Sequence, residues 1–238
     1  MALFSFFEIE TTTVCNLRCP TCPVSVSPRP VHFMDESLFS KAVEELAGMG
    51  FAGTFSPHFY NEPLADERLP RLLRLAKTVN PAMRIVLFTN TTLMTPQLFR
   101  ELADSGVEEF VVSTDNPVIA RSCERLLAEL GPPERGLVRT RTISNSALYN
   151  RGGALTGLPG LTQPATCRAP SDYMVVDAWG EVLLCYNDYL REHPLGSLAK
   201  RTILDIWNDP AYEKIRLDAA KGHYTQGICH RCRLSSPA

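Results

Sequence analysis

The sequence predicts an α/β protein, in which an open, partial barrel of parallel strands is followed by a small second lobe. Segments of strand length alternate with segments of helical periodicity through the first 143 residues, as in βα units around a parallel sheet. Polar side chains directly follow several of these strands. Cysteines form one group near each end of the chain, and seven of the eight belong to these two groups.

Length and charge set outer limits on the function. The 238 residues suffice for one full domain and a small second one. A formal net charge of −2, from 24 basic and 26 acidic residues, gives no reason to expect a nucleic-acid or membrane partner. Arg135, Arg139 and Arg141 are interpreted as a solvated loop and strand edge rather than a phosphate patch. Without a membrane-length apolar stretch or a signal-peptide pattern, a cytoplasmic location is expected.

Five strands are expected in the first part of the chain, each a short run rich in apolar, β-branched or aromatic residues. In order, they cover residues 6–10, 51–56, 84–89, 109–114 and 137–143. Five such strands in about 150 residues are too few for a closed eightfold barrel, so the barrel is expected to be partial and open.

Helical segments fill the intervals between these strands. Apolar residues recur at helical spacing in 35–49, 69–79, 96–105 and 118–130. Asp35 and Glu36 give the first of these helices an N-terminal signal. Cys123 lies inside the last one and is interpreted as a small core residue.

The pattern changes after residue 143. Residues 144–164 are rich in Gly, Asn, Ser and Pro and are expected to form a long loop. A β-hairpin is expected over 174–185, turning at 178–180, followed by helical segments at 203–208 and 211–221. The predicted division is therefore a barrel at 1–143, a connecting loop at 144–166 and a C-terminal domain at 167–238.

The polar residues at the strand ends predict one composite site, because ligands gather at the carboxyl ends of parallel strands. A cysteine loop follows the first strand. The other candidates after the second, third and fourth strands are Asn61, Glu62, Thr89, Asn90, Ser113 and Asp115.

The first cysteine group is Cys15, Cys19 and Cys22, with the spacing CxxxCxxC. Three thiolates can hold three corners of a 4Fe–4S cluster, which leaves the fourth iron open to another ligand. Zinc sites also use short cysteine spacings, so the spacing alone does not decide the metal.

The second group is Cys167, Cys185, Cys229 and Cys232, the last two at CxxC spacing. Four thiolates can close a tetrahedral zinc site or fully ligate an iron–sulfur cluster. Taken by themselves, these four residues leave both metals open.

The two groups together resemble the radical S-adenosylmethionine enzymes with a twitch domain, a shortened relative of the SPASM extension. The resemblance implies a partial (βα)6 barrel with a C-terminal auxiliary-cluster lobe of one β-hairpin and helices. It also implies two 4Fe–4S clusters held by the seven cysteines, S-adenosyl-L-methionine at the open iron, and a flavodoxin or ferredoxin-type reductant as partner. In the family, the open iron binds the amino and carboxylate groups of the methionine part.

The resemblance also implies cosubstrate contacts. The segment from Tyr60 to Pro63 is similar to the family's GGEP element, so Asn61 and Glu62 are expected near the methionine amino group. Thr89, Asn90, Ser113 and Asp115 match strand-end positions that hold the ribose and the methionine carboxylate. Thr21 stands where the family usually has an aromatic residue beside the adenine, which leaves that contact unassigned.

Within the family, the short length and the loop at Asn150 and Arg151 resemble dehydrogenases of antibiotic biosynthesis that oxidise an aminocyclitol alcohol to a ketone. This implies that a 5′-deoxyadenosyl radical abstracts hydrogen and that the substrate loses two electrons. Arg151 is expected to bind the alkoxide and Asp188 a substrate amino group. Tyr60 is a further catalytic candidate. Alternatively, it is an aromatic side chain that packs over the sheet.

Two alternatives remain open from the sequence. One is radical modification of a ribosomal peptide by epimerisation or crosslinking, because many twitch and SPASM enzymes act on peptides. The other is a non-catalytic binding protein whose C-terminal lobe is stapled by zinc.

Overall fold

The computed structural model describes residues 3–142, 149–158 and 166–233. In this part of the chain, one mixed sheet has the strand order β5-β4-β3-β2-β1-β6-β7-β8. The strands are β1 Phe6–Ile9, β2 Thr54–Ser56, β3 Arg84–Phe88, β4 Val107–Ser113, β5 Val138–Arg141, β6 Tyr173–Val176, β7 Glu181–Leu183 and β8 Pro194–Ser197. Neighbours from β5 to β6 pair in parallel, and β7 and β8 add antiparallel strands. The sheet is open, which confirms the predicted partial barrel.

A sixth parallel strand comes from the second lobe. The expected hairpin forms from β6 and β7, but β6 also pairs in parallel with β1, with Phe7 opposite Met174. Periodicity reports only local structure, so it could not reveal this pairing between distant segments. The sheet therefore continues across the predicted boundary between the lobes.

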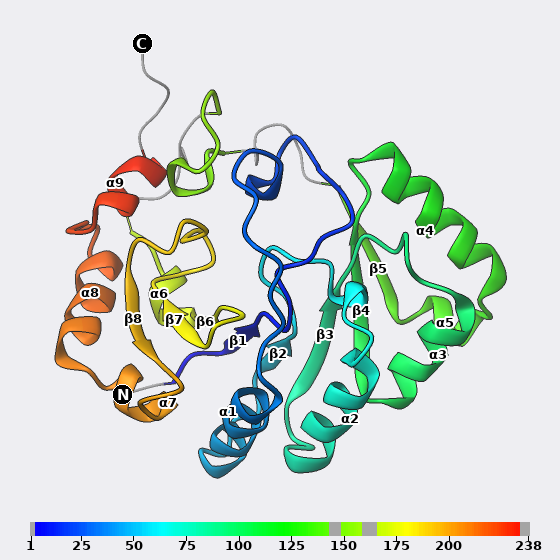
Figure 1. Cartoon of the computed structure of the whole chain (residues 1–238), viewed down its shortest axis with the longest axis horizontal. Helices are drawn as coiled ribbons and strands as arrows, with labels where there is room; N and C mark the ends of the chain where they lie inside the picture. Colours follow the sequence, from blue (N-terminus) through cyan, green and yellow to red (C-terminus); the bar gives the residue numbers. More distant parts are fainter. Residues whose placement is uncertain (1–2, 143–148, 159–165, 234–238) are drawn as a thin grey trace.

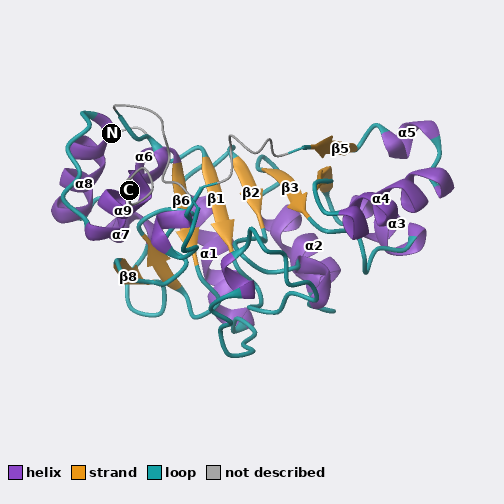
Figure 2. Cartoon of the chain, turned by 90° about the horizontal axis from the view of Figure 1, so that it is seen from above, coloured by secondary structure: helices purple, strands orange, loops and turns teal. Residues whose placement is uncertain are grey.

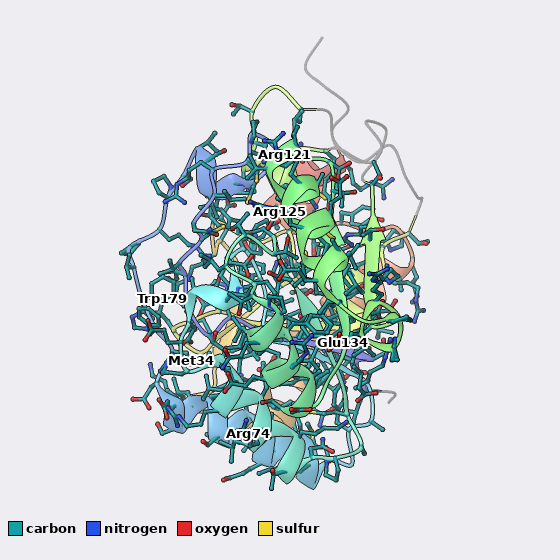
Figure 3. The ribbon with its side chains drawn as sticks, turned by 90° about the vertical axis from the view of Figure 1, so that its right-hand side faces the viewer. Met34, Arg74, Arg121, Arg125, Glu134 and Trp179 are labelled. Atoms are coloured by element: carbon teal, nitrogen blue, oxygen red, sulfur yellow. The ribbon has the colours of Figure 1, made fainter. Side chains whose placement is uncertain are left out.

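The four expected barrel helices are present as α1 Glu36–Gly48, α2 Leu69–Val79, α3 Pro96–Asp104 and α4 Pro117–Glu129. Side-chain caps fix several of their starts. Asp35 accepts a hydrogen bond from the Ser37 backbone N–H at 2.8 Å, and Asn116 accepts one from Val118 at 2.8 Å. In α4, Arg121 and Arg125 lie on the exposed face (Figure 3) while Cys123 is buried, as predicted.

The other α-helices of the described chain are α5 Pro132–Arg135, α6 Ala169–Asp172, α7 Ile203–Trp207, α8 Pro210–Ala220 and α9 Gly227–Arg233. The 3-10 helices are η1 Pro23–Ser25, η2 Pro63–Ala65 and η4 Arg151–Gly153. Of the predicted loop 144–164, only 149–158 are described, and residue 143 of the fifth predicted strand also lies outside the described residues.

Both lobes share one hydrophobic core. Helices α1 and α2 pack beside each other along the sheet (Figure 2), and buried sheet residues such as Phe55 and Phe110 belong to the same cluster as Met174 and Trp207 of the second lobe. The Trp207 ring meets Phe4, just before β1, edge to face with centroids 5.1 Å apart. Helices α7 and α8 lie at the β8 end of the sheet (Figure 1). None of the described helices has the length and apolarity needed to cross a membrane.

Candidate active site

A cavity of about 430 Å³ lies at the carboxyl ends of the parallel strands. It brings together side chains that are far apart in sequence, as the strand-end argument predicted. The predicted site residues in its lining are Cys15, Cys19, Cys22, Tyr60, Asn61, Glu62, Thr89, Asn90, Ser113 and Arg151. Thr21 lines it too, whereas Asp115 and Asp188 are not in the lining.

The cysteine loop leaves β1 through a buried polar stretch that holds its two ends together. The Thr13 hydroxyl donates to the Pro30 carbonyl at 2.8 Å and accepts from the His32 backbone N–H at 2.9 Å. Arg29 donates both Nη groups to the buried Glu10 carboxylate, at 2.8 and 2.6 Å. Bidentate pairs of this kind fix geometry as well as charge, so the loop is anchored at its base.

Further hydrogen bonds tie the cysteine loop to neighbouring strand ends. Asn90 donates to Asn16 Oδ1 at 2.9 Å, and Asn16 donates to the Thr92 hydroxyl at 2.7 Å. The Asn116 amide, at the start of α4, donates to Cys19 Sγ at 3.6 Å. The loop after β1 is therefore positioned by the ends of β3 and β4.

Both carboxylate oxygens of Glu62 accept hydrogen bonds from the protein. Its Oε1 accepts from Leu64 N and the Thr89 hydroxyl at 3.1 and 2.7 Å, and its Oε2 accepts from Asn90 N at 2.7 Å. Burial raises the pKa of Glu62 to about 7. A cationic amino group would stabilise the ionised carboxylate, which matches the ligand expected there.

Asn61 carries a buried donor without a protein acceptor. Its Oδ1 accepts from Phe59 N at 3.0 Å, while Nδ2 is buried with no hydrogen-bond partner among the described residues. A buried amide N–H without an acceptor is costly, so a bound oxyanion would relieve it. The Asn61 side chain therefore fits a cosubstrate contact.

The cavity is also lined by the buried Glu8, which sequence analysis missed, and by the partly buried His58, which follows the second strand. Burial raises the pKa of Glu8 to about 8, and burial together with Arg141 lowers that of His58 to about 4. The available signal for Glu8 was an acid within an otherwise apolar strand. Deciding whether that acid faced a cavity required the sheet.

Arg141 also lines the cavity, which the interpretation of its cluster as solvated did not include. The edge position of β5 agrees with that interpretation, and Arg139 forms a surface ion pair with Glu109. Only Arg141, opposite Ser113 at the end of the strand, reaches the cavity.

The second cysteine group lines an adjacent cavity of about 350 Å³ with all four of its members. The backbone N–H of Asn187 donates to Cys185 Sγ at 3.4 Å, and its side-chain amide donates to Cys232 Sγ at 3.6 Å. Tyr173 and Tyr186 line both cavities, so the two cysteine groups are separated by a shared wall.

Burial raises the pKa of thiols in both groups, and neighbouring cysteines add to the effect. The values reach about 11 for Cys15, about 12 for Cys229 and about 11 for Cys232. Thiolates gathered in this way need a cationic centre to be stable, which fits metal ligation.

The donor chemistry also bears on which metal centre fits. Among the described residues, no three or more His, Cys, Asp or Glu side chains form a group that could hold a single metal ion. All seven grouped cysteines line the two cavities, and thiolates are the usual protein ligands of iron–sulfur clusters.

A short segment from Tyr149 to Gly153 joins the two cavities. Arg151 donates to the Tyr149 hydroxyl at 2.9 Å, and that hydroxyl donates to Asn187 Oδ1 at 2.8 Å. Gly152 has a φ of +69°, and an added Cβ would lie 2.8 Å from Ile228 Cγ1. Its backbone N–H also hydrogen bonds to Cys232, which favours the thiolate. Arg151 thus faces the first cavity on a loop docked against the second.

Asp188 serves a turn between β7 and β8. Its carboxylate oxygens accept from the backbone N–H groups of Glu192 and His193 at 2.9 and 3.1 Å. Burial raises the pKa of Asp188, and these hydrogen bonds oppose the shift.

Tyr60 is a packed aromatic that also reaches the first cavity. Its ring packs edge to face on Phe59 and Tyr189, with centroids 4.6 and 4.9 Å away, and it also lines the first cavity. Burial raises its pKa well above the ordinary value, and nearby Arg151 opposes the shift.

Comparison with known proteins agrees with this architecture. The Radical SAM superfamily matches residues 9–118, and the SPASM iron–sulfur cluster-binding domain matches residues 167–233. The S-adenosyl-L-methionine-dependent 2-deoxy-scyllo-inosamine dehydrogenase of Niallia circulans is 30% identical over 233 residues, which is 97% of this chain and 93% of that protein. GTP 3′,8-cyclase of Chlorobaculum tepidum is 31% identical over 115 residues, 46% of this chain and 32% of that protein.

Solved structures show the same relationship. A crystal structure of BtrN in complex with AdoMet and 2-DOIA matches with a TM-score of 0.86 and 29% identity, covering 96% of this chain and 92% of that one. Native anSMEcpe with bound AdoMet has a TM-score of 0.62 and 14% identity, covering 97% of this chain and 91% of that one. The second match shows the fold alone.

Fold and site together define an iron–sulfur enzyme that uses S-adenosylmethionine. More specifically, the chain belongs to the radical SAM superfamily and carries a SPASM-type domain. It is a dehydrogenase of that superfamily, and its cofactors are two 4Fe–4S clusters and S-adenosyl-L-methionine. The predicted family, enzyme class and cofactors are confirmed.

Proposed function

We propose that the enzyme oxidises an alcohol carbon of an aminocyclitol or sugar-like molecule to a ketone. Cys15, Cys19 and Cys22 are proposed to hold the first cluster. The proposed ligands of the second are Cys167, Cys185, Cys229 and Cys232. The main observation behind the proposal is that the two cavities are adjacent. The cavity lined by three cysteines and strand-end residues shares Tyr173 and Tyr186 with the cavity lined by four cysteines. Similarity along nearly the whole chain to a dehydrogenase of 2-deoxy-scyllo-inosamine supports it.

The cofactors supply a 5′-deoxyadenosyl radical that removes hydrogen from the carbinol carbon, and an acceptor for the remaining electron. The protein must hold the substrate and remove its hydroxyl proton. Arg151, which lines the cavity and has no carboxylate partner within salt-bridge distance among the described residues, is suited to bind the alkoxide. We assign Tyr60 to the wall of the substrate site that also contains Arg151.

Glu8 is our proposed proton acceptor. Its buried carboxyl lines the cavity, and with a pKa of about 8 its ionised form, whose fraction grows as pH rises toward 8, is a stronger base than an ordinary carboxylate. Because both oxygens of Asp188 accept backbone hydrogen bonds, we keep Asp188 as a positioning residue for the loop beside the second cavity.

The cosubstrate contacts follow from the same lining. We assign Asn61 Nδ2 and Glu62 to the methionine part, and Thr89, Asn90 and Ser113 to the ribose and carboxylate side. Asp115 lies just beyond β4 and outside the cavity lining. We propose that it also contributes to binding the ribose and carboxylate of the cosubstrate. The adenine contact stays unassigned.

A flavodoxin or ferredoxin-type protein is proposed as reductant, because the reaction starts with a one-electron reduction. A cytoplasmic location is proposed with it, since seven thiols kept for metal ligation need a reducing compartment.

Anaerobic reconstitution tests the proposal. Two clusters require about eight irons per chain. An aminocyclitol substrate should yield equal amounts of 5′-deoxyadenosine and ketone. Solvent deuterium retained at a substrate carbon, with no carbonyl formed, would instead identify an epimerase and point to the peptide alternative.

A further inference from the structure

Asn187 contacts two thiols of the second cysteine group, although sequence analysis gave it no role. It follows Cys185 by two residues in the turn after β7, and only 4% of its surface is exposed. Its backbone N–H donates to Cys185 Sγ at 3.4 Å, and its Nδ2 donates to Cys232 Sγ at 3.6 Å. One buried residue therefore gives hydrogen bonds to cysteines from two distant segments of the chain.

The other end of the same side chain leads to the first cavity. Asn187 Oδ1 accepts from the Tyr149 hydroxyl at 2.8 Å, and that hydroxyl accepts from Arg151 Nη1 at 2.9 Å. The Arg151 guanidinium carbon also lies 4.5 Å from the centre of the Tyr149 ring, a cation–π distance. Arg151 lines the first cavity and Asn187 the second. A series of three hydrogen bonds thus joins a guanidinium in one cavity to a thiol, Cys232, in the other.

The donors and acceptors of this series allow only one direction. An arginine can only donate, so the Tyr149 oxygen must accept from it and give its single proton to Asn187 Oδ1. The amide of Asn187 then directs its N–H groups at Cys232. A reversed amide would point its oxygen at the sulfur of a metal-bound thiolate, which has no proton to give. The orientation of Arg151 and the hydrogen bond to the thiol therefore depend on the same amide.

The proposed oxidation removes two electrons from the substrate, and the second one must cross between the cavities. The first electron leaves with the hydrogen atom, as the carbinol C–H bond breaks and a C–H bond of 5′-deoxyadenosine forms. The hydroxyl proton passes to a base. The second electron then leaves and reduces the second cluster while the C=O bond forms. Since Arg151 is proposed to bind the oxygen of that bond, the hydrogen-bond series connects the oxidised group with the electron acceptor.

Hydrogen bonds to thiolate ligands also affect the acceptor itself. Reduction makes an iron–sulfur cluster more negative, and N–H groups directed at its sulfurs stabilise that added charge, so they raise its reduction potential. Asn187 supplies two such donors to the proposed ligands Cys185 and Cys232. A higher potential favours transfer of the second electron from the substrate.

We propose that Asn187 is a positioning residue that serves both centres. Its N–H donors raise the reduction potential of the second cluster. Its Oδ1 holds Tyr149, and through it Arg151, in the orientation that binds the substrate oxygen. This inference rests on the proposed alcohol oxidation and specifies how the substrate site is coupled to the electron acceptor.

The reduction potential of the second cluster tests the first function without turnover. Asn187→Leu stays neutral and similar in size, but it removes the side-chain donor to Cys232. The potential is measured by redox titration with electron paramagnetic resonance in a Cys15→Ala background, in which only the second cluster is expected. The equilibrium constant for reduction should fall about tenfold, which corresponds to a potential about 59 mV more negative. An unchanged potential would overturn the inference.

Two further variants keep this measurement decisive. Asn187→Asp retains an oxygen for Tyr149 but, when ionised, has no N–H for Cys232, so it should also lower the potential even if Asn187→Leu fails to retain iron. Asn208→Leu is the matched control, because Asn208 is an exposed amide at the end of α7 in the same lobe. It should leave the potential and the iron content unchanged.

Tyr149→Phe separates the second function from the first, because it removes the hydroxyl between Arg151 and Asn187 and leaves the donor to Cys232 in place. Calorimetric titration of the reconstituted enzyme, with S-adenosylmethionine and no reductant, uses 2-deoxy-scyllo-inosamine and myo-inositol as probes. Tyr149→Phe should weaken probe binding about 3- to 10-fold and leave the potential unchanged. Asn187→Leu should change both quantities. A lower potential in Tyr149→Phe as well would show that the loop acts only as one structural unit, which would overturn the inference.

The two measurements also distinguish failure of this inference from failure of the proposed function. If the wild-type enzyme binds neither probe and forms no ketone from them after reduction, the proposed substrate class is rejected. The potential then decides the role of Asn187 by itself. Ketone formation by Asn187→Leu at the wild-type rate, with an unchanged potential, would reject the role of Asn187 and leave alcohol oxidation standing.

Discussion

The two cysteine regions differ in what holds them. The first loop is tied to strand ends by hydrogen bonds from Asn90 to Asn16 and from Arg29 to Glu10, and its cysteines line a cavity that they share with ligand-binding candidates. The second group is enclosed by a hairpin and α9, with amide donors from Asn187 and Gly152 on its thiols. The difference is consistent with the proposed roles, in which the first centre meets ligands and the second accepts an electron.

The largest expected effect separates the two regions by cysteine substitution. Cys15→Ala should reduce iron to about four per chain and abolish cleavage of S-adenosylmethionine. Cys232→Ala should lose a similar amount of iron but keep cleavage while losing the ketone. Iron analysis and product quantification measure both. Cleavage retained by Cys15→Ala would contradict the assignment of the first region.

Arg151 lies between the regions and should affect only the substrate. Arg151→Ala removes the cation proposed to bind the alkoxide, so ketone formation should fall about 10²- to 10³-fold. Cosubstrate cleavage should remain measurable, because the cosubstrate contacts are elsewhere in the lining. Unchanged ketone formation would remove Arg151 from the reaction.

Glu8 should give the first region a characteristic pH dependence. As a base with a pKa of about 8, it should make oxidation increase with pH up to about 8 and then level off. Glu8→Gln should lower the rate about 100-fold and remove this increase.

The same group has an effect of opposite sign on stability. Native Glu8 keeps its proton up to about pH 8, whereas the unfolded chain releases it near 4.5. The native state binds more protons between these values, so the free energy of unfolding should decrease as pH rises through this window. Denaturant unfolding of Glu8→Gln should show a weaker decrease, while Glu129→Gln on the exposed face of α4 should behave as wild type.

A substitution at Gly152 should affect mainly the second region. Gly152→Ala combines a left-handed φ with a contact to Ile228, and should destabilise the docked loop by about 1–3 kcal/mol. Thermal unfolding and second-cluster iron content measure this. Gly48→Ala, whose new Cβ meets nothing within 4 Å, should show neither loss.

The smallest expected effect concerns the two hydrogen bonds of one side chain in the first loop. Asn16→Ala breaks its links to Asn90 and Thr92, which should cost about 1 kcal/mol of stability. First-cluster loading should become slower while second-cluster loading is unchanged. Equal slowing of both would show that the two regions do not assemble independently.

Most of the fold and part of the candidate site could be predicted from the sequence. Strand and helix periodicity located β1 to β4 and α1 to α4, because each of these elements carries buried apolar residues, whereas β5 was located although none of its residues is buried. The strand β8, Pro194–Ser197, has no such alternation and was missed. The parallel pairing of β6 with β1 joins segments far apart in the chain, and local patterns do not encode it.

The site divides in the same way. Cysteine spacing and strand-end position revealed the residues with local signatures, and all but Asp115 and Asp188 lie in the lining of one of the two cavities. Glu8 and Arg141 were missed because their place in the lining depends on which strand face meets the cavity. Arg139 and Arg141 look alike in sequence, yet only Arg139 has Glu109 as a partner.

The pairing of β1 with both β2 and β6 has a practical meaning for assembly. A fragment ending at residue 142 would leave β1 as a bare sheet edge, open to pairing with another copy. The halves are thus unsuited to separate expression or to exchange between relatives.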